Sequence, residues 1–400
     1  IVALFIGLQL SAEEIFRDRK ILKREKFLNL SRSGYLVAKI SVLFTISAIQ
    51  ALAFVLVANT LVGVKEMFFV YWFAFFTTAA FANMLGLNIS ASFDSAILIY
   101  ILIPLVIIPM MVLSGAMFSF DKLNRNITRV DKVPLLAELM PTKWSYEALM
   151  VHQFKENRFQ KNFYQVDKRI NNSDFKQSYF IPQLQEMLRE CEQDMMQNGK
   201  ITYSESKLNV LQNEILNERK AYEGMSGLNP EDLSEDKFSL KTAGIVSTYL
   251  SELNLYYLEL FSAANRGKNN MVRKIMENKK QLYYSWLDIY FNESVSDEVR
   301  KIFERKKIVE YNSRLIQKID PVFLDPRPSS AIDFRTHFYA PRKHLFGMYF
   351  DTYWFNMSVI WFLTLVCYIT LYFDVMRKMI NFTTSRGILS ILRGSRVKLT

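Results

Sequence analysis

Long apolar runs alternate with polar segments along this chain of 400 residues, and they are unevenly placed. A helix needs roughly 20 residues to cross about 30 Å of hydrocarbon. The runs that reach this length are Tyr35 to Ala58, Met67 to Ile89, Ala96 to Phe118, and Tyr349 to Phe373. Because lipid offers no partner for free backbone groups, each run is predicted to be a spanning helix.

A shorter apolar run, Ile1 to Phe16, opens the chain. It has neither the basic region before it nor the small-residue cleavage site after it that a signal peptide needs. We therefore expect it to be the end of a fifth spanning helix that began upstream, in a longer protein. Pro104 and Pro109 lie inside the third complete run, so that helix is expected to be kinked or locally unwound.

A polar region separates the last apolar run from the others and is predicted to form a large, mainly helical insert. Pro182 suits a first helical turn, and helix breaks are expected at Asn198-Gly199, Gly224 to Pro230, Arg266-Gly267 and Asn292. Ile245 to Phe261 is expected to form its core, and a proline-rich stretch returns to the membrane. The expected organisation is transmembrane helices over 1–118, an insert over 119–343, the last transmembrane helix over 344–376, and a basic tail over 377–400.

Basic residues in the short connections predict the orientation, because Lys and Arg favour the cytoplasmic side. The link after the first run and the tail after the last run are both basic. Counting the crossings gives the same answer, with the whole insert outside. The chain carries an excess of 11 basic over acidic residues, most of it in these flanks, so attraction to lipid headgroups explains it better than nucleic-acid binding.

The insert and the membrane runs offer little catalytic chemistry. The two cysteines, Cys191 and Cys367, lie far apart, no CxxC pair occurs, and the three histidines are isolated. We therefore expect no catalytic, cofactor-binding or metal site. Gln50 and Asn83 are expected to form hydrogen bonds between helices, while Glu13 and Glu14, at the inner end of the first run, are either a functional polar pair or acids that face water.

The charged link from residue 17 to residue 34 allows two interpretations. It is either a solvated connector or a docking helix for a cytoplasmic motor domain. The residues expected to take part in docking are Arg17, Arg19, Lys20, Lys23, Arg24 and Glu25.

Two stretches of the sequence resemble the permease half of G-subfamily ABC transporters. In the first, Glu13, Arg24-Glu25, Tyr35 and Lys39 stand where that family has a Glu at the end of its second helix, a charged segment, and a Tyr and Lys opening the third. In the second, Ser114-Gly115 is followed by Met140 to Leu149, which is similar to the family element Pro-x-x-Trp/Tyr-x-Tyr-Glu-Ala-Leu. The similarity covers roughly residues 1 to 160 and 340 to 380.

The resemblance implies an all-α membrane fold with six spanning helices per permease, of which this chain would hold about five. It also implies pairing with a second permease copy and an ATPase domain upstream in the same polypeptide, where ATP and Mg would bind. The chain itself has no Gly-x-x-x-x-Gly-Lys-Ser/Thr phosphate loop, so it is not expected to be an enzyme and needs no cofactor of its own. The link over 17–34 would then be the coupling segment.

The family also suggests where a gate would lie, and here the sequence departs from it. Ile6 takes the place of an aromatic slot residue, and Ala116 and Met117 replace a Leu-Leu plug after Ser114-Gly115. These five residues are the gate candidates, and a site for flat polycyclic drugs is not expected. Glu13, Glu14, Lys39 and Gln50 are the candidate polar membrane residues.

The expected function is therefore that of a permease domain of an ATP-driven exporter in a bacterial inner membrane, with the insert in the periplasm. An envelope partner for the insert is a further expectation. The alternative is a membrane-anchored sensor or envelope scaffold that transports nothing and whose insert is the working part.

Overall fold

A computed structural model describes residues 1–25, 31–123, 129–224 and 227–382 of the chain. It is mostly helical and divides into two compact units. Unit 1 comprises Ile1–Thr128, Val133–Leu149 and Phe350–Thr400; unit 2 comprises Arg129–Lys132 and Met150–Tyr349. The sequence-based boundary at residue 119 places residues 133–149 in the insert, whereas the structure groups them with the apolar helices.

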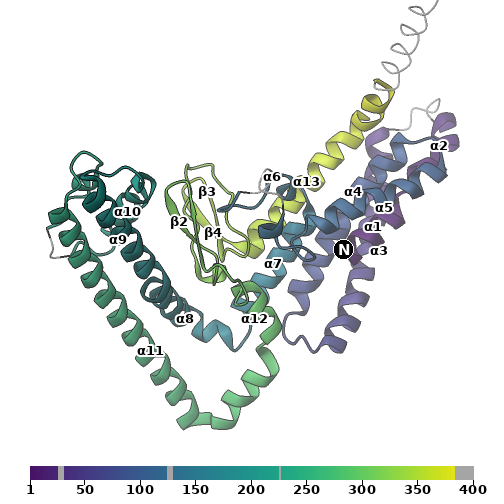
Figure 1. The fold of residues 1–400 in the computed structure, drawn as a ribbon. Coiled ribbons are helices and arrows are strands. Elements are labelled where there is room, and N and C mark those ends of the chain that lie inside the picture. The colour runs from purple at the N-terminus through teal and green to yellow at the C-terminus, as the bar shows by residue number, and fades with distance from the viewer. Residues whose placement is uncertain (26–30, 124–128, 225–226, 383–400) are drawn as a thin grey trace, which may run out of the picture. The chain divides into compact units, whose positions relative to one another are not determined.

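Among the described residues, unit 1 is a bundle of apolar and amphipathic helices from the N-terminal part of the chain and from near its C-terminus (Figure 1). In chain order its elements are α1 (Val2–Ser11), α2 (Glu14–Glu25), α3 (Arg32–Val62), α4 (Phe68–Ser92), α5 (Ala96–Val112), the short η2 (Phe120–Lys122), α6 (Leu135–Glu138), α7 (Pro141–Lys155, which continues into unit 2) and α13 (Thr352–Tyr372). Helix α4 is central, because α1, α3 and α13 all pack against it.

Side chains and glycine fix the ends of the long apolar helices. The Ser31 hydroxyl accepts a hydrogen bond from Gly34 N at the start of α3, and the Asp351 carboxylate accepts one from Tyr353 N at the start of α13. Gly63 ends α3 in the left-handed conformation, at φ 75°. These caps satisfy backbone groups that lipid would leave without partners.

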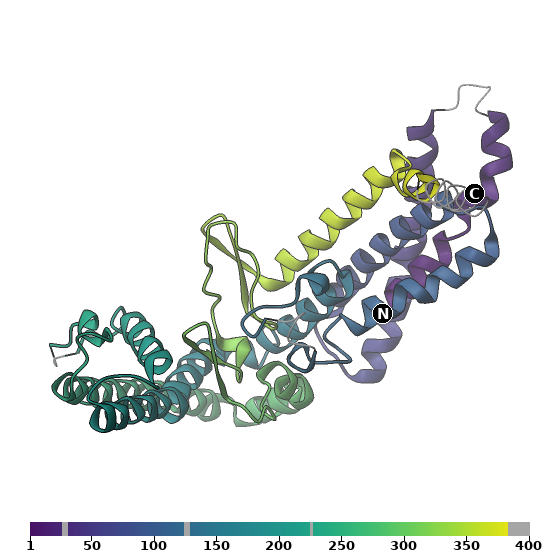
Figure 2. The ribbon, with the colours of Figure 1, turned by 45° about the horizontal axis from the view of Figure 1, so that its top comes forward.

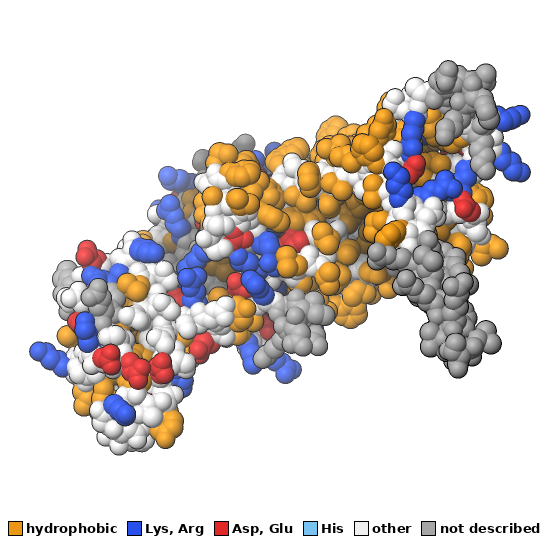
Figure 3. Space-filling view, turned by 90° about the horizontal axis from the view of Figure 1, so that it is seen from above, with side chains coloured by type: hydrophobic (Ala, Val, Ile, Leu, Met, Phe, Trp, Pro, Cys, Tyr) orange, Lys and Arg blue, Asp and Glu red, His pale blue; other side chains and the backbone are white. Residues whose placement is uncertain are grey.

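Helices α3, α4 and α13 are long and apolar enough to cross a membrane, and α5 is an apolar helix of 17 residues. Figure 3 shows hydrophobic side chains covering much of this part of the chain, with Lys and Arg gathered at one end. Pro104 and Pro109 lie within α5, which continues through both. The protein is thus a membrane protein with several candidate spans, while the number of five stays a prediction.

The first apolar run is not a single helix up to Phe16, as the sequence suggested. Helix α1 ends at Ser11, whose hydroxyl donates back to Gly7 O at 2.8 Å. Phe16 N then donates to the Ser90 hydroxyl of α4 at 2.9 Å instead of continuing the helix. Hydrogen bonds from side chains thus separate α1 from the amphipathic α2.

Unit 2 is helical but also contains two β-hairpins, which the all-α prediction missed. Its helices are α8 (Gln160–Phe175), the π turn η3 (Lys176–Phe180), α9 (Ile181–Asn198), α10 (Glu205–Glu218), η4 (Pro230–Leu233), α11 (Leu240–Tyr290), α12 (Glu293–Arg300) and η5 (Pro321–Phe323). The hairpins are β1 (Ile308–Tyr311) with β2 (Arg314–Gln317), and β3 (Arg342–Leu345) with β4 (Met348–Asp351).

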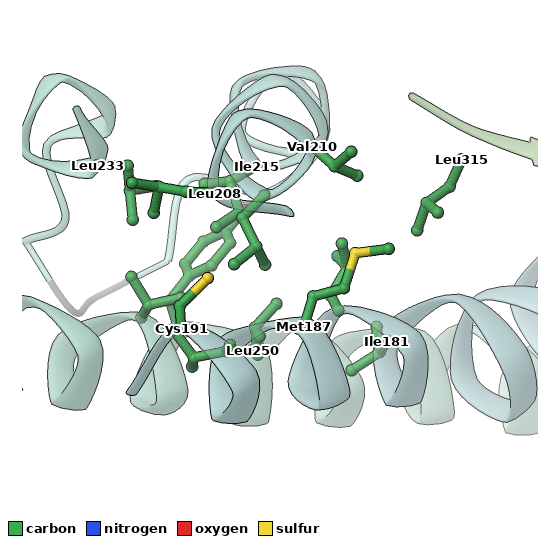
Figure 4. Close-up of a cluster of buried hydrophobic side chains, with 14 of the residues drawn as sticks. Ile181, Met187, Cys191, Leu208, Val210, Ile215, Leu233, Leu250 and Leu315 are labelled. Carbon is green, nitrogen blue, oxygen red and sulfur yellow. The ribbon is translucent and has the colours of Figure 1, made fainter. Parts of the chain in front are cut away.

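The core of unit 2 lies where α9, α10 and α11 meet (Figure 4). Ile181, Leu250 and Val210 are fully buried there, and Leu315 on β2 joins them. The core prediction for Ile245 to Phe261 is confirmed at Leu250 and Leu253 but wrong at Leu260, which is exposed. Only one face of a helix can point inward, and Leu260 lies on the outer face of α11.

The helix boundaries of unit 2 were predicted with mixed success. Pro182 does lie in the first turn of α9, and Gly199 ends α9 in the left-handed conformation, as expected. Asn292 caps α12 by accepting a hydrogen bond from Val295 N. The break expected at Arg266-Gly267 is wrong, because α11 continues through both residues; a lone glycine weakens a helix without ending it.

Candidate functional site

Helix α2, which contains residues 17–25 of the predicted coupling segment, lies at one end of the bundle of unit 1 (Figures 1 and 2). Its apolar residue Ile15 packs in a cluster with Leu36 of α3, Leu87 of α4 and Leu371 of α13. The helix is therefore docked on the ends of three apolar helices and is not a solvated connector along its whole length.

Lys39 of α3 holds α2 through two carboxylates. Its ammonium lies 2.6 Å from Glu14 Oε2 and 2.8 Å from Asp18 Oδ2, one helical turn apart on α2. The Tyr35 hydroxyl donates to Asp18 Oδ2 at 3.0 Å. We call Glu14, Asp18, Tyr35 and Lys39 the anchor cluster.

Asp18 of the anchor cluster is kept ionised by its neighbours. Partial burial would raise the pKa of Asp18, but the hydrogen bonds from Lys39 and Tyr35 outweigh burial and lower that pKa below its usual value. The Asp18 carboxylate is therefore ionised at neutral pH, and the link between α2 and α3 is ionic as well as apolar.

Arg19 joins α2 to the C-terminal end of α4. Its guanidinium donates to Ser90 O at 3.1 Å, to Ala91 O at 2.8 Å and to Phe93 O at 2.8 Å, and it pairs with Asp94. Free carbonyls and the negative end of the helix dipole make this a favourable place for a cation. One side chain of α2 thus occupies the end of the central helix of unit 1.

Arg32 forms a similar contact that the sequence analysis did not single out. It donates to Leu371 O at 3.0 Å and pairs with Asp374 at 2.6 Å, at the C-terminal end of α13. The sequence feature that could have identified Arg32 is its position in the basic link, at the first residue of α3. Two arginines therefore cap two different apolar helices at the same end of the bundle.

The other predicted coupling residues are less engaged. Arg17 is largely exposed and pairs with Glu14 at 2.5 Å within α2. Lys20 and Arg24 are exposed. The side chains of Lys23 and Glu25, and residues 26–30 of the predicted segment, lie outside the described residues.

The predicted polar membrane residues are spread over several places. Glu14 and Lys39 meet in the anchor cluster. Glu13 lies in the turn between α1 and α2 and is partly buried. Asn83 of α4 donates to Ser47 Oγ of α3 at 2.8 Å, which confirms the expected bond between helices. Gln50 makes no such bond through Oε1, which is buried and has no partner among the described residues.

The gate candidates lie on two elements. Ile6 is half-buried on α1, and Ser114 to Met117 follow the C-terminal end of α5. The Ser114 hydroxyl donates to Met111 O at 2.7 Å and accepts from Ala116 N at 3.1 Å, so it forms a tight turn with Gly115 at φ 81°. Met117 is exposed. A gating role for these residues stays a prediction.

A second polar site, which the sequence analysis did not identify, occupies the Pro141 to Leu149 motif. Lys143 is fully buried, with its ammonium 2.9 Å from Glu138 Oε2, 3.3 Å from Glu147 Oε2 and 3.5 Å from the centre of the Trp144 ring. The Asn356 amide of α13 donates to Trp144 O at 3.0 Å and to Glu147 Oε2 at 3.1 Å. We call Glu138, Lys143, Glu147 and Asn356 the buried ion cluster.

The buried ion cluster is structural in character. Each buried charge has an opposite charge or an amide donor beside it, as burial demands. Thr142 Oγ1 also donates to Met110 O of α5, at 2.5 Å. Through these bonds the motif ties α5, α7 and α13 together.

Among the described residues, no group of three or more His, Cys, Asp or Glu side chains is arranged to hold a metal ion. The polar sites of unit 1 instead combine carboxylates, cations and helix ends. Several of these ion pairs join two elements, as Lys39–Glu14 joins α3 to α2 and Arg19–Asp94 joins α2 to the end of α4.

The comparison with protein families gives a match over the first part of the chain. Residues 1–154 match the model of the family described as ABC-2 type transporter. This part of the chain is therefore similar to the membrane domain of ABC-2 type transporters. The matched range includes α1 to α6, almost all of α7, the anchor cluster and the Pro141 to Leu149 motif. No curated protein and no solved structure matches the chain.

Proposed function

We propose that the protein is the permease of an ATP-driven ABC exporter and that α2 couples its spanning helices to a cytoplasmic ATPase domain. The family match over residues 1–154 supports ABC transport. The exporting direction, the pairing of two permeases and the ATPase in the same polypeptide belong to the proposal. So do the bacterial inner membrane, the cytoplasmic side of α2 and the periplasmic location of the insert.

The observation that carries the coupling role is the set of contacts of α2. Lys39 and Arg19 connect α2 to α3 and to the end of α4 by charge-assisted hydrogen bonds, the stronger kind. A push on α2 from the ATPase domain would therefore reach two candidate spans at once. In alternating access, the transport pathway opens first to one side of the membrane and then to the other. Such a mechanism would follow if movement of α2 displaced the candidate spans and opened the turn over Ser114 to Met117.

The test uses the full-length protein in lipid vesicles. Arg19→Ala should lower ATP hydrolysis by roughly fivefold or more, the scale of typical coupling free energies of 1–3 kcal/mol, while ATP binding stays unchanged. Lys65→Ala is the matched control, because Lys65 is an exposed basic residue at the other end of α3. Hydrolysis in this control should equal that of the wild type.

A second readout follows the proposed gate. A cysteine at Met117 should change its reactivity toward a membrane-impermeant thiol reagent when ATP is added, and Arg19→Ala should abolish this change. If the protein hydrolyses no ATP, or if Arg19→Ala and Lys65→Ala behave alike, α2 is a passive linker and the proposal is wrong.

A further inference from the structure

The β3–β4 hairpin carries apolar side chains at a place where a water-soluble hairpin would carry polar ones. At its tip Phe346 is 67% exposed, and Met348, the next residue after Gly347, is 58% exposed. Tyr349 and Phe350 are also exposed. Contiguous exposed apolar side chains mark an interaction surface.

The chain offers its own comparison in the β1–β2 hairpin. Both hairpins join strands of four residues through two residues of positive φ, which are Asn312 and Ser313 in one and Phe346 and Gly347 in the other. Asn is well suited to this conformation, whereas a bulky aromatic residue is an outlier there. Phe346, at φ 51°, thus accepts backbone strain while its ring points away from the protein core.

The position of this tip along the chain indicates what covers it. Strand β4 ends at Asp351 and α13, a candidate span, begins at Thr352, so no linker separates them (Figure 1). Five residues of extended chain reach about 17 Å, so the tip stays within that distance of the start of the span. Trp354, exposed in the first turn of α13, is the residue type that marks the level of the headgroups.

Backbone hydrogen bonding holds the tip in place. Phe346 N donates to Ala331 O at 2.7 Å, which ties the turn to a loop whose next residue, Ile332, is exposed as well. Within the hairpin, the ring of the buried His344 contacts the ring of the half-exposed Tyr349, with centroids 5.3 Å apart. The hairpin is thus held by the bond from Phe346 N and by this ring contact, while its tip carries exposed apolar side chains.

We propose that the β3–β4 hairpin is an interfacial anchor whose tip inserts into the headgroup and upper acyl region of the bilayer beside α13. An aromatic residue in a strained turn gains nothing from water, but it gains from transfer to the membrane interface. The inference needs only that α13 spans the membrane. It holds whichever side the insert faces, and it does not depend on export.

The test uses the full chain in phosphatidylcholine vesicles that contain a phosphatidylcholine with a diazirine near the headgroup end of its acyl chain. After illumination, mass spectrometry should locate lipid adducts on Phe346 and Met348 and on α13. Residues Asn312 and Ser313 of the matched hairpin should carry none.

The double variant Phe346→Asn/Met348→Ser should lose most of the hairpin adducts, while the adducts on α13 stay at the wild-type level. The α13 adducts show that the variant is folded and inserted, so a loss confined to the hairpin supports the anchor. Absence of hairpin adducts in the wild type would overturn the proposal and assign the patch to a second copy of the chain or to another protein. Equal adducts on both hairpins would overturn it too, because contact with lipid would then be unspecific.

Discussion

At the scale of single residues, Lys143 shows how a membrane protein tolerates a buried cation. The ammonium compensates two carboxylates, and Asn356 of α13 supplies a further donor to Glu147. Removing one partner from a buried ion pair leaves an uncompensated charge, which costs far more than the pair contributes.

We therefore expect Lys143→Met to destabilise the protein by about 3–5 kcal/mol. Thermal unfolding in detergent, followed by tryptophan fluorescence, measures the effect. Adding Glu147→Gln should recover part of the loss, because it removes one of the two unpaired charges. Lys161→Met, at an exposed lysine, serves as the control and should change stability by no more than about 0.5 kcal/mol. Similar melting temperatures for Lys143→Met and Lys161→Met would contradict this account.

From the sequence, the residues of the buried ion cluster could be recognised only as part of a family motif. Residues 140–149 were noticed for their resemblance to a family element, yet nothing in their spacing predicted that Lys143 is buried or that Asn356, more than two hundred residues later, completes the cluster. Burial of a charge depends on tertiary contacts, and a hydropathy pattern reports only local tendencies. Lys39 was also noticed through the family resemblance, and its partners Glu14 and Asp18 became known only from the structure.

At the scale of elements, the contact between α1 and α4 depends on small residues. A Cβ atom added at Gly7 would lie 2.6 Å from Ala79 O and 2.7 Å from Ala82 Cβ. These distances are too short, and one of the atoms belongs to the backbone of α4. Close approach of two helices through Gly and Ala is the usual way in which apolar helices associate where the hydrophobic effect is weak.

The same substitution should have opposite effects at two glycines. Gly7→Ala should destabilise the protein by about 1–3 kcal/mol, because it overpacks the α1–α4 contact. Gly244→Ala should stabilise it by about 0.5–1 kcal/mol, since Gly244 lies within α11 with open space around it. Melting temperatures of the two variants provide the measurement. A stabilising Gly7→Ala would mean that α1 and α4 are not in close contact.

The apolar helices were the most predictable elements, and the short strands the least. Long runs such as those of α3 and α13 can be recognised from the sequence alone, because crossing the bilayer requires both length and an apolar composition. Strands of four residues produce no comparable periodic signal, and both hairpins were missed. The end of α1 at Ser11 was also missed, since it depends on a hydrogen bond from Phe16 N to Ser90, which is distant in sequence.

At the scale of the whole molecule, unit 2 has a core of its own. A segment from Asn162 to Lys318 contains nearly all of this core. That end point omits Val322 and Phe323, although Tyr164 OH donates to Val322 O at 2.8 Å and Phe323 packs against Phe154. A longer fragment retains these contacts.

We expect a fragment of residues 150–340 to unfold in one cooperative transition and to melt at a higher temperature than a fragment of residues 162–318. Burying each large apolar side chain contributes roughly 1.5–3 kcal/mol, and the shorter fragment loses Phe154 and Phe323. Circular dichroism during heating compares the two fragments. A disordered spectrum for the longer fragment at all temperatures would show that unit 2 needs the membrane helices to fold.

The bonds from Asn356 to Trp144 and Glu147 have one more consequence. They join two parts of unit 1: α7, shortly before the chain enters the long segment of unit 2 at Met150, and α13, shortly after the chain returns from that segment at Phe350. An inserted domain whose two attachment points lie close together can be exchanged, lengthened or lost without changing the fold of the domain that carries it. The long segment of unit 2 is thus free to vary in sequence and length independently of the apolar helices. A sensor or affinity domain inserted between Leu149 and Phe350 should leave the helix bundle of unit 1 folded.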